Sequence, residues 1–159
     1  MSTIQLSAEV ITYEKFQAYG QQIMATGDGK PYDAADAQLE LSSGIPRFYI
    51  MRLQQRGRQF DRITRHQRCT QCLGSLAGKD WYLAVAPPSP GSAPNLDQLM
   101  AFKIPGTCFV KLHVGTWHAG PYFDEPFIDF YNLELSDTNI TDHETYAIAT
   151  SVGITYEIV

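Results

Sequence analysis

Residues 105–123 read PGTCFVKLHVGTWHAGPYF and contain two of the four histidines of the chain, His113 and His118. A third, His66, stands in the earlier run RHQRCTQCLGSLAGKDWYLAV of residues 65–85. Both runs read as strands or strand ends beside turns marked by glycine or proline. A β-barrel can bring two such strands together around one pocket, where neutral imidazoles carry protons or bind metal.

The remaining chain is dominated by short strand patterns. Residues 70–76 and 80–86 are predicted to form a hairpin around Ala77-Gly78. Turns recur about every eight to twelve residues, which indicates an all-β barrel or sandwich in one domain of residues 1–159. The other expected strands cover residues 47–53, 60–68, 107–113, 127–135, 144–149 and 154–159.

Few segments favour helix. Thr12 can N-cap a short helix that runs through Tyr19 and ends at Gly20. Asn95 can cap one further helical turn. Residues 25–46 are rich in Gly, Asp, Ala and Ser and are expected to form a long loop.

Composition fits an ordered protein with a substantial core. The chain has 159 residues, of which 44% are hydrophobic and 18% charged. It shows neither a signal-peptide pattern nor the roughly 20 apolar residues that span a bilayer. We therefore expect a cytoplasmic protein that does not bind membranes.

Charge is distributed unevenly. All seven arginines lie between residues 47 and 68, a window of charge +6 in a chain whose net charge is −5. Nucleic acid is a poor partner, because the whole is acidic and the patch lacks interleaved aromatic stacking residues. Most arginines are expected to meet acids elsewhere in the chain or across a dimer, and a small carboxylate or an acidic partner surface stays open as a ligand. The seven are Arg47, Arg52, Arg56, Arg58, Arg62, Arg65 and Arg68.

Cys69-Thr-Gln-Cys72 has the spacing of a redox pair or of half a zinc site. Redox pairs usually open a helix, whereas these two residues lie in a strand pattern that points them to opposite faces. With Cys108 as the only other cysteine, we expect buried packing thiols.

Several of these motifs resemble the ureidoglycolate lyase family, once called ureidoglycolate hydrolase. Residues 65–85 are similar to its His-x-x-x-Thr-Gln pattern with a glycine turn and an apolar strand, and residues 105–123 to its His-x-x-x-Trp-His segment. DFYNLE, residues 129–134, resembles its following strand, and FQAYG, residues 16–20, its opening helix. One departure is clear: the family's typical second histidine after Trp-His is replaced by Ala119-Gly120.

The resemblance implies a cupin-like β-barrel of jelly-roll type with a short N-terminal helix, usually a homodimer. It implies cleavage of ureidoglycolate, a small anionic substrate, to glyoxylate and urea in the breakdown of purine and allantoin nitrogen. Two alternatives stay open: a non-catalytic barrel that binds a small carboxylate or sugar acid, and a different metal-dependent cupin enzyme such as an isomerase or dioxygenase.

On this resemblance, side chains from three strands are expected to form one pocket. His66 and His118 would share the acid and base roles in an order left open, with His113 supporting them or binding metal. Lys111 or Arg62 would hold the carboxylate, and Gln71 and Glu134 would orient these groups. His143 is expected at the surface, and Trp117 as a packing aromatic in the pocket wall.

A metal ion is a separate question. Cupin barrels commonly bind a divalent ion through histidines and a carboxylate, and nickel or manganese would suit His66, His113, His118 and Glu134. The chain lacks the His-x-His pair typical of metal-binding cupins. The sequence therefore leaves the metal open.

Overall fold

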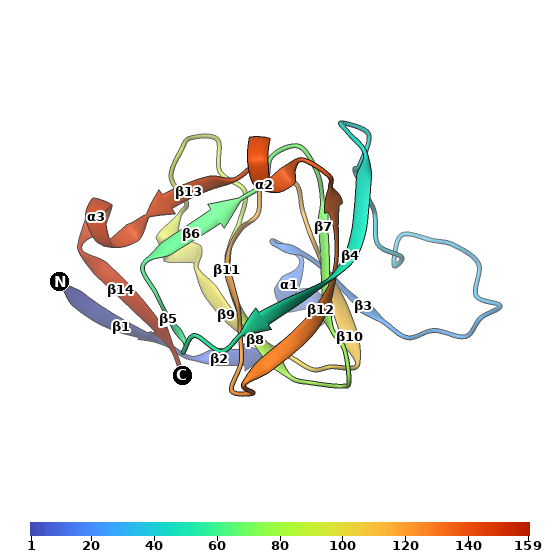
Figure 1. Cartoon of the computed structure of the whole chain (residues 1–159), viewed down its shortest axis with the longest axis horizontal. Coiled ribbons are helices and arrows are strands. Elements are labelled where there is room, and N and C mark those ends of the chain that lie inside the picture. The colour runs from blue at the N-terminus through green and yellow to red at the C-terminus, as the bar shows by residue number, and fades with distance from the viewer.

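A computed structural model describes all residues 1–159 and confirms the all-β prediction. Fourteen strands form three sheets, and the helical segments are short (Figure 1). The two larger sheets face each other as an open, flattened barrel that hydrogen bonds do not close, consistent with a cupin-like arrangement. None of the helices is long and apolar enough to cross a membrane.

The five-stranded sheet has the order β3-β10-β7-β12-β4. Its longest pairing joins β12 to β4 in antiparallel register from Phe127 opposite Gln54 to Leu135 opposite Pro46. In sheet order, the strands span Gly20–Met24, Cys108–Leu112, Gln71–Ser75, Phe127–Leu135 and Pro46–Gln54.

The six-stranded sheet has the order β13-β6-β11-β8-β9-β2. Its central strand β11 pairs with β6 on one side and with β8 on the other. In sheet order, the strands span Glu144–Ala147, Arg62–Arg65, Trp117–Tyr122, Trp81–Ala86, Met100–Ile104 and Ala8–Val10.

The main core lies between these two sheets. Strand β12 contributes Ile128 and Phe130, and β8 contributes Trp81 and Leu83 from the facing sheet. Phe130 and Trp81 meet edge to face, with their ring centroids 5.2 Å apart. The alternation of β-strand side chains therefore gives each large sheet one apolar inner face, as the hydrophobic pattern requires.

A second core lies on the other face of the six-stranded sheet. It contains Trp117 and Ile63 from that sheet and Tyr156 from a small sheet of order β1-β14-β5 that covers them. Strands β1, β14 and β5 span Ser2–Leu6, Ile154–Ile158 and Gln59–Phe60. This extra layer covers the outer face of β11, where Trp117, Ala119 and Tyr122 are buried in the second core.

The predicted hairpin of residues 70–76 and 80–86 is wrong. Strand β7 belongs to the five-stranded sheet and β8 to the six-stranded sheet, so the turn between them crosses from one sheet to the other. Ala77 and Gly78 both have positive φ, 60° and 68°, which lets the chain reverse sharply between the layers. The sequence predicted the turn correctly and its strand pairing incorrectly.

The helical segments confirm the two predicted N-caps, whereas Gly20, predicted to end the first helix, is the first residue of β3. Helix α1 (Tyr13–Phe16) begins at Thr12, whose hydroxyl accepts a hydrogen bond from the Lys15 amide, and it ends before the predicted Tyr19. Asn95 caps the short 3₁₀ turn η1 (Leu96–Gln98). Helices α2 (Thr138–Thr141) and α3 (Ile148–Val152) flank β13.

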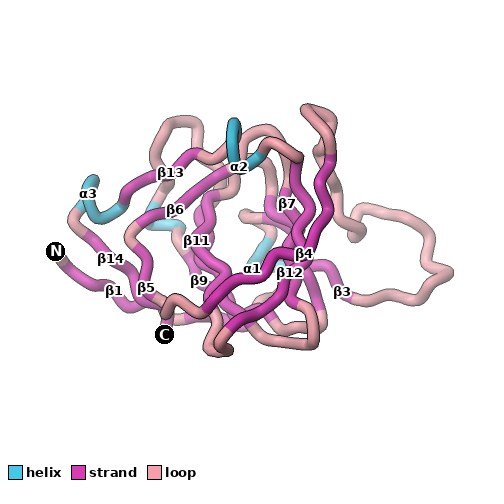
Figure 2. The backbone as a smooth tube through the Cα atoms, in the orientation of Figure 1, coloured by secondary structure: helices cyan, strands magenta, loops and turns pink.

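Residues 25–45 contain neither helix nor strand, as predicted, and extend away from the sheets as a long loop between β3 and β4 (Figure 2). The Gln21 side chain anchors this loop, because its amide nitrogen donates to the carbonyl oxygens of Ala34 and Asp36. Its amide oxygen accepts from the Gln38 amide.

Candidate active site

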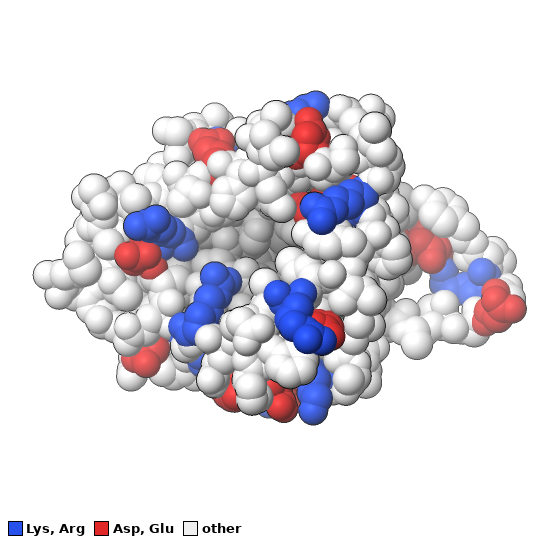
Figure 3. Space-filling view, viewed as in Figure 1, with Lys and Arg blue, Asp and Glu red and all other residues white.

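The inner faces of the two large sheets change from apolar to polar toward one end. Along β12 the inward positions run from Phe130 to Asn132 and Glu134, and along β7 from Leu73 to Gln71. At this end the core is replaced by a cleft. Figure 3 shows it as a hollow near the centre of the face with basic side chains, in blue, around it; the cleft-lining residues include Arg56 and Arg62.

The cleft has an outer part of about 370 Å³ and an inner part of about 180 Å³, sizes that suit a small-molecule ligand. The outer part is lined by β5, β6 and β11, and the inner part by β4, β7, β11 and β12. Four residues line both parts and so define where they join: Arg56, His118, Gly120 and His143.

His66 is held in one tautomer by the backbone. Its Nδ1 lies 2.6 Å from the Asp142 carbonyl oxygen, which only accepts, so Nδ1 carries the proton and Nε2 keeps its lone pair. The Asp142 carboxylate accepts from the amides of Gln67 and Arg68, which fixes the segment that follows β6. Burial lowers the pKa of His66, while the Asp142 carbonyl and the Glu134 carboxylate oppose that shift.

His118 stands beside it, with ring centroids 5.1 Å apart. It is placed by the pairing of β11 with β6, in which His118 lies opposite Thr64. Its Nδ1 lies 3.3 Å from the Thr116 carbonyl oxygen, so its Nε2 also keeps a lone pair. Burial, with the neighbouring His66, lowers the pKa of His118 to about 3. At neutral pH both rings are therefore neutral.

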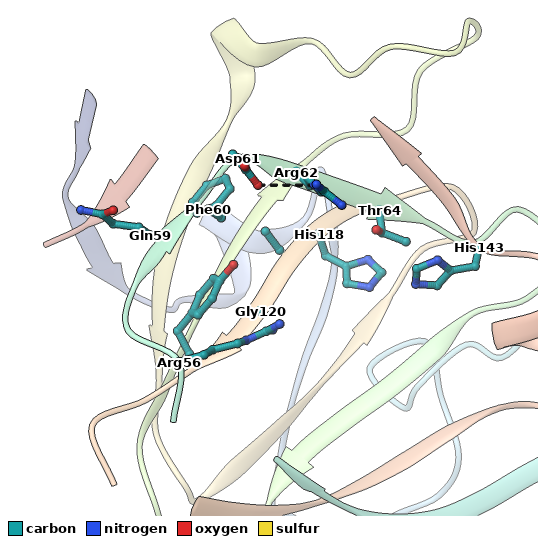
Figure 4. A pocket seen from close by; sticks show the side chains of 11 residues that line it. Arg56, Gln59, Phe60, Asp61, Arg62, Thr64, His118, Gly120 and His143 are labelled. Atoms are coloured by element: carbon teal, nitrogen blue, oxygen red, sulfur yellow. Dashed lines mark ion pairs between the residues drawn. The ribbon is translucent and has the colours of Figure 1, made fainter. Parts of the chain in front are cut away.

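His143 joins this pair, a placement that the sequence does not indicate. It is exposed, as expected of a polar turn, yet its ring centroid lies 5.6 Å from that of His66 and it lines the cleft. Figure 4 shows the rings of His118 and His143 next to each other, with Arg62 above His118 and Arg56 below it to the left. The only sequence signal was its place between Asp142 and Glu144, which predicted a surface turn.

The two predicted orienting residues belong to one buried hydrogen-bond network. Gln71 Nε2 donates to Asn132 Oδ1 at 3.0 Å, and Asn132 Nδ2 donates to Glu134 Oε1 at 2.8 Å. The Tyr49 hydroxyl donates to the same Glu134 oxygen at 3.1 Å. Asn132 and Tyr49 are thus members of the site that were not predicted from the sequence.

Five of the seven arginines form ion pairs with acids of the same chain, as expected for most of them. Arg65 is the most buried, and it binds Glu144 while stacking 4.4 Å from the Trp117 ring centroid. The other four pairs are Arg52–Asp129, Arg58–Asp124, Arg62–Asp61 and Arg68–Asp137.

Arg56 forms no ion pair and lies 4.9 Å over the Tyr122 ring, lining both parts of the cleft. Arg62, predicted to hold a carboxylate, lies at the rim with its side chain 72% exposed and 3.6 Å from Asp61. Because Arg56 has no acidic partner, it is the cation most available to an anionic ligand.

Lys111 lies on the opposite side of the five-stranded sheet from the cleft. Its neighbours Val110 and Leu112 point into the main core, so Lys111 points to the outer face, where burial lowers its pKa. Its Nζ lies 3.0 Å from His113 Nδ1, and His113 Nε2 lies 2.9 Å from the Gln17 carbonyl oxygen. Both nitrogens of His113 are therefore bonded within the protein.

A model of the ureidoglycolate lyase family matches residues 3–154 of this sequence. The chain belongs to the ureidoglycolate lyase family. No curated protein gives a significant match to the sequence. The family match covers both histidine segments and supports a lyase function.

The departure from the family's Trp-His-His pattern lies at a residue that borders the outer part of the cleft, although its side chain packs in the second core. Trp117 and Ala119 both point into the second core, Trp117 fully buried and Ala119 7% exposed, while His118 between them faces the cleft. The side chain of a histidine at position 119 would therefore be directed toward the second core in this lyase-family chain. Trp117 packs as predicted, but against the second core, and its Nε1 donates to the Ser89 hydroxyl.

Gly120 lies where the two parts of the cleft join, in a backbone conformation that requires glycine. Its φ of 127° is a conformation that favours glycine, and β11 has a bulge there against β8. An added Cβ would lie 3.1 Å from the Tyr82 carbonyl oxygen. A larger residue would strain the strand and crowd β8.

The metal site considered from the sequence is not assembled. No group of three or more His, Cys, Asp or Glu side chains is arranged to hold an ion. His113 lacks a free nitrogen, so the predicted set of His66, His113, His118 and Glu134 does not converge. The cysteines are free and buried, as expected of packing thiols, and burial raises the pKa of Cys72 to about 11.

Proposed function

We propose that the cleft cleaves ureidoglycolate to glyoxylate and urea, using His66 as the proton carrier and Arg56 as the carboxylate-binding residue. The observation that carries this proposal is the pairing of His66 with His118. Each ring has its Nδ1 hydrogen-bonded to a backbone carbonyl and its Nε2 free of protein partners. Two neutral acceptors are thus adjacent in one small cleft.

The reaction moves one proton and breaks one bond. The carbinol hydroxyl loses its proton as its oxygen becomes the aldehyde of glyoxylate, the carbon–nitrogen bond breaks, and the leaving nitrogen gains a proton to give urea. Both the hydroxyl and the nitrogen are attached to the same carbon. A single imidazole nitrogen can therefore take the proton from oxygen and return it to nitrogen, with no net change in the enzyme.

His66 is better suited than His118 to carry that proton. The Asp142 carbonyl and the Glu134 carboxylate favour its protonated form, whereas His118, with a pKa of about 3, stays neutral. In this proposal His66 Nε2 accepts the hydroxyl proton, and His118 Nε2 accepts a hydrogen bond from the N–H on the same carbon. Positioned proton transfer of this kind contributes about 10²- to 10⁴-fold to rate.

Arg56 would hold the substrate carboxylate at the exposed side of the cleft. It is the cleft arginine without an acidic partner, and a guanidinium binds a carboxylate through two parallel N–H donors. Lys111 has no role in this proposal, because its side chain points away from the cleft.

The test is urea and glyoxylate release from racemic ureidoglycolate by the purified protein with and without added divalent metal. We expect stereospecific release that is lost in His66→Ala and strongly reduced in His118→Ala. His113→Gln is the matched control, because this ring lines neither part of the cleft and both of its nitrogens are bonded within the protein; it should leave the rate near that of the unaltered protein. The absence of release above background would contradict the proposal.

The predicted homodimer and cytoplasmic location stay predictions. An exposed apolar surface supports a dimer: Phe48 and Ile50 on the outer side of edge strand β4 are 70% and 63% exposed. Light scattering coupled to size-exclusion chromatography tests it, with a mass twice that of the 17.8 kDa chain expected.

A further inference from the structure

Two hydrogen-bond acceptors in the cleft have no partner. Gln71 Oε1 and Glu134 Oε2 are buried and accept no hydrogen bond from the protein, although the two residues are only 8% and 1% exposed. Both residues line the inner part of the cleft. A buried acceptor that stays unsatisfied is costly, so such atoms point to a ligand that donates hydrogen bonds.

Glu134 determines which group donates and which accepts in each hydrogen bond of this network. A carboxylate can only accept, so Asn132 must direct its amide nitrogen to Glu134 Oε1 and its oxygen to Gln71. Gln71 must then donate through Nε2, which leaves its Oε1 as an acceptor. Tyr49 supports this arrangement because its hydroxyl donates to the same Glu134 oxygen. The free atoms of both residues are therefore oxygens.

Strand register brings these two residues together. The last registered pair of β7 and β12 at this end is Cys72 opposite Leu133, and the next position on each strand is Gln71 or Glu134. Both point to the inner face. Directly opposite side chains in an antiparallel pair have Cβ atoms about 4.5–5.5 Å apart, which lets both oxygens contact one small group.

We propose that Gln71 and Glu134 bind the terminal amino group of a ureido substrate, with Asn132 and Tyr49 as positioning residues. This inference rests on the proposed function and adds the direction in which the substrate lies. The amino group carries two N–H donors and no strong acceptor, which matches two oxygens. The ureido end is then in the inner part of the cleft, and the carboxylate points toward Arg56.

This arrangement makes the enzyme selective for the amino group itself. A methyl group in the same position would leave both oxygens without partners, and hydrogen bonds to charged groups are among the stronger ones in proteins. Sites built to bind a donor reject the analogue that lacks it more strongly than they reject a change in size.

The experiment compares two non-reactive acids by calorimetric titration. Ureidoacetate has the ureido and carboxylate groups without the reacting hydroxyl, and N-acetylglycine differs from it by a methyl group in place of the amino group. We expect ureidoacetate to bind about tenfold or more tightly than N-acetylglycine. Equal affinity for the two acids would overturn the inference while leaving the proposed carboxylate site intact. If neither acid binds, both the inference and the proposed function fail.

Glu134→Gln tests the residues directly. If Asn132 still donates to residue 134, the new amide nitrogen takes the place of the free oxygen at position 134. If Asn132 instead accepts from residue 134 and donates to Gln71, the Gln71 amide nitrogen is the one that faces the cleft. In either case one acceptor becomes a donor, so we expect the preference for ureidoacetate to disappear while N-acetylglycine binding changes little. A preference that persists in this variant would contradict the inference.

Two further variants guard against effects of folding and charge. Gln71→Met removes the other acceptor without changing charge and should abolish the preference in the same way. Glu157→Gln on β14, which lines neither part of the cleft, is the matched control for the change of a carboxylate to an amide and should keep the preference. Circular dichroism melting establishes that each variant is folded before titration.

Discussion

The ring centroids of His66 and His118 are 5.1 Å apart, with the ring planes inclined by 52°, although the two residues are distant from each other in the sequence. The contact follows from the antiparallel pairing of β6 with β11, which sets Thr64 opposite His118. His66 stands just beyond the end of β6, on the same side as Thr64. Two imidazoles with free Nε2 atoms thereby share one cleft.

Replacement of His66 by Ala should lower kcat by about 10²- to 10⁴-fold, because the proton carrier is lost. His118→Ala should cost less, since in our proposal His118 only accepts a hydrogen bond. Steady-state assays of urea release show which of the two variants loses more of its kcat. A larger loss in His118→Ala than in His66→Ala would assign the proton transfer to His118 instead.

Acid should destabilise the protein partly through His118. Its pKa is about 3 in the folded chain against 6.5 ordinarily, so between these values the unfolded chain binds a proton that the folded chain does not. The free energy of unfolding therefore falls as the pH drops through this window and is unaffected by His118 above it. We expect Tm to fall less between pH 7 and pH 5 in His118→Gln than in the unaltered protein, as measured by calorimetry. An equal fall would show that His118 does not titrate in this way.

Replacement of Arg56 by Met should raise KM for ureidoglycolate about tenfold or more with a smaller effect on kcat, because a carboxylate-binding cation is removed from the cleft. Arg52→Met is the control, since Arg52 pairs with Asp129 on the outer face of the sheet. Initial-rate kinetics over a range of substrate concentrations separate the two constants. An unchanged KM in Arg56→Met would remove Arg56 from the site.

Lys111→Met should leave kcat/KM within about twofold and should not lower the free energy of unfolding by more than about 1 kcal/mol. The ammonium is buried without an acidic partner, and an unbranched apolar side chain of similar length fills the same space. Chemical denaturation and urea-release assays measure both quantities. A collapse of kcat/KM with normal folding would restore Lys111 to the substrate site predicted from the sequence.

Ala119→His, which introduces the residue typical of the family, should not raise activity. Position 119 points into the second core, so a larger polar ring there should overpack it and cost about 1–3 kcal/mol of stability. Thermal melting and the urea assay together check this. Position 119 borders the outer part of the cleft, so a gain in kcat without loss of stability would mean that the new ring turns into the cleft.

Local patterns in the sequence were sufficient for several elements. The alternation in residues 127–135 predicted β12 to the residue and put Ile128, Phe130, Asn132 and Glu134 on one face. The caps at Thr12 and Asn95 depend on side chains that bond to amides two or three residues away. Such features are fixed by neighbours in the chain, so they can be read from it.

Which face of a strand meets the cleft was decided by the tertiary structure. Alternation correctly grouped Phe109, Lys111 and His113, but it could not show that this group lies on the outer face of the five-stranded sheet. The same limit applies to the turn at Ala77-Gly78. Its sequence predicts a turn equally well whether the turn joins two paired strands or crosses from one sheet to the other.

Tertiary structure also explains why Arg56, His143 and Asn132 belong to the site. Each is an ordinary polar residue in its local sequence, and its role depends on segments distant in the chain that pack beside it. The sequence by itself determined many of the strands, the two N-caps and the histidine motifs, because these depend on short-range bonding and periodicity, but it did not indicate β1, β2, β3 or β9. The tertiary structure alone decided which polar groups share the cleft and which are left without a partner there, because that depends on long-range strand pairing.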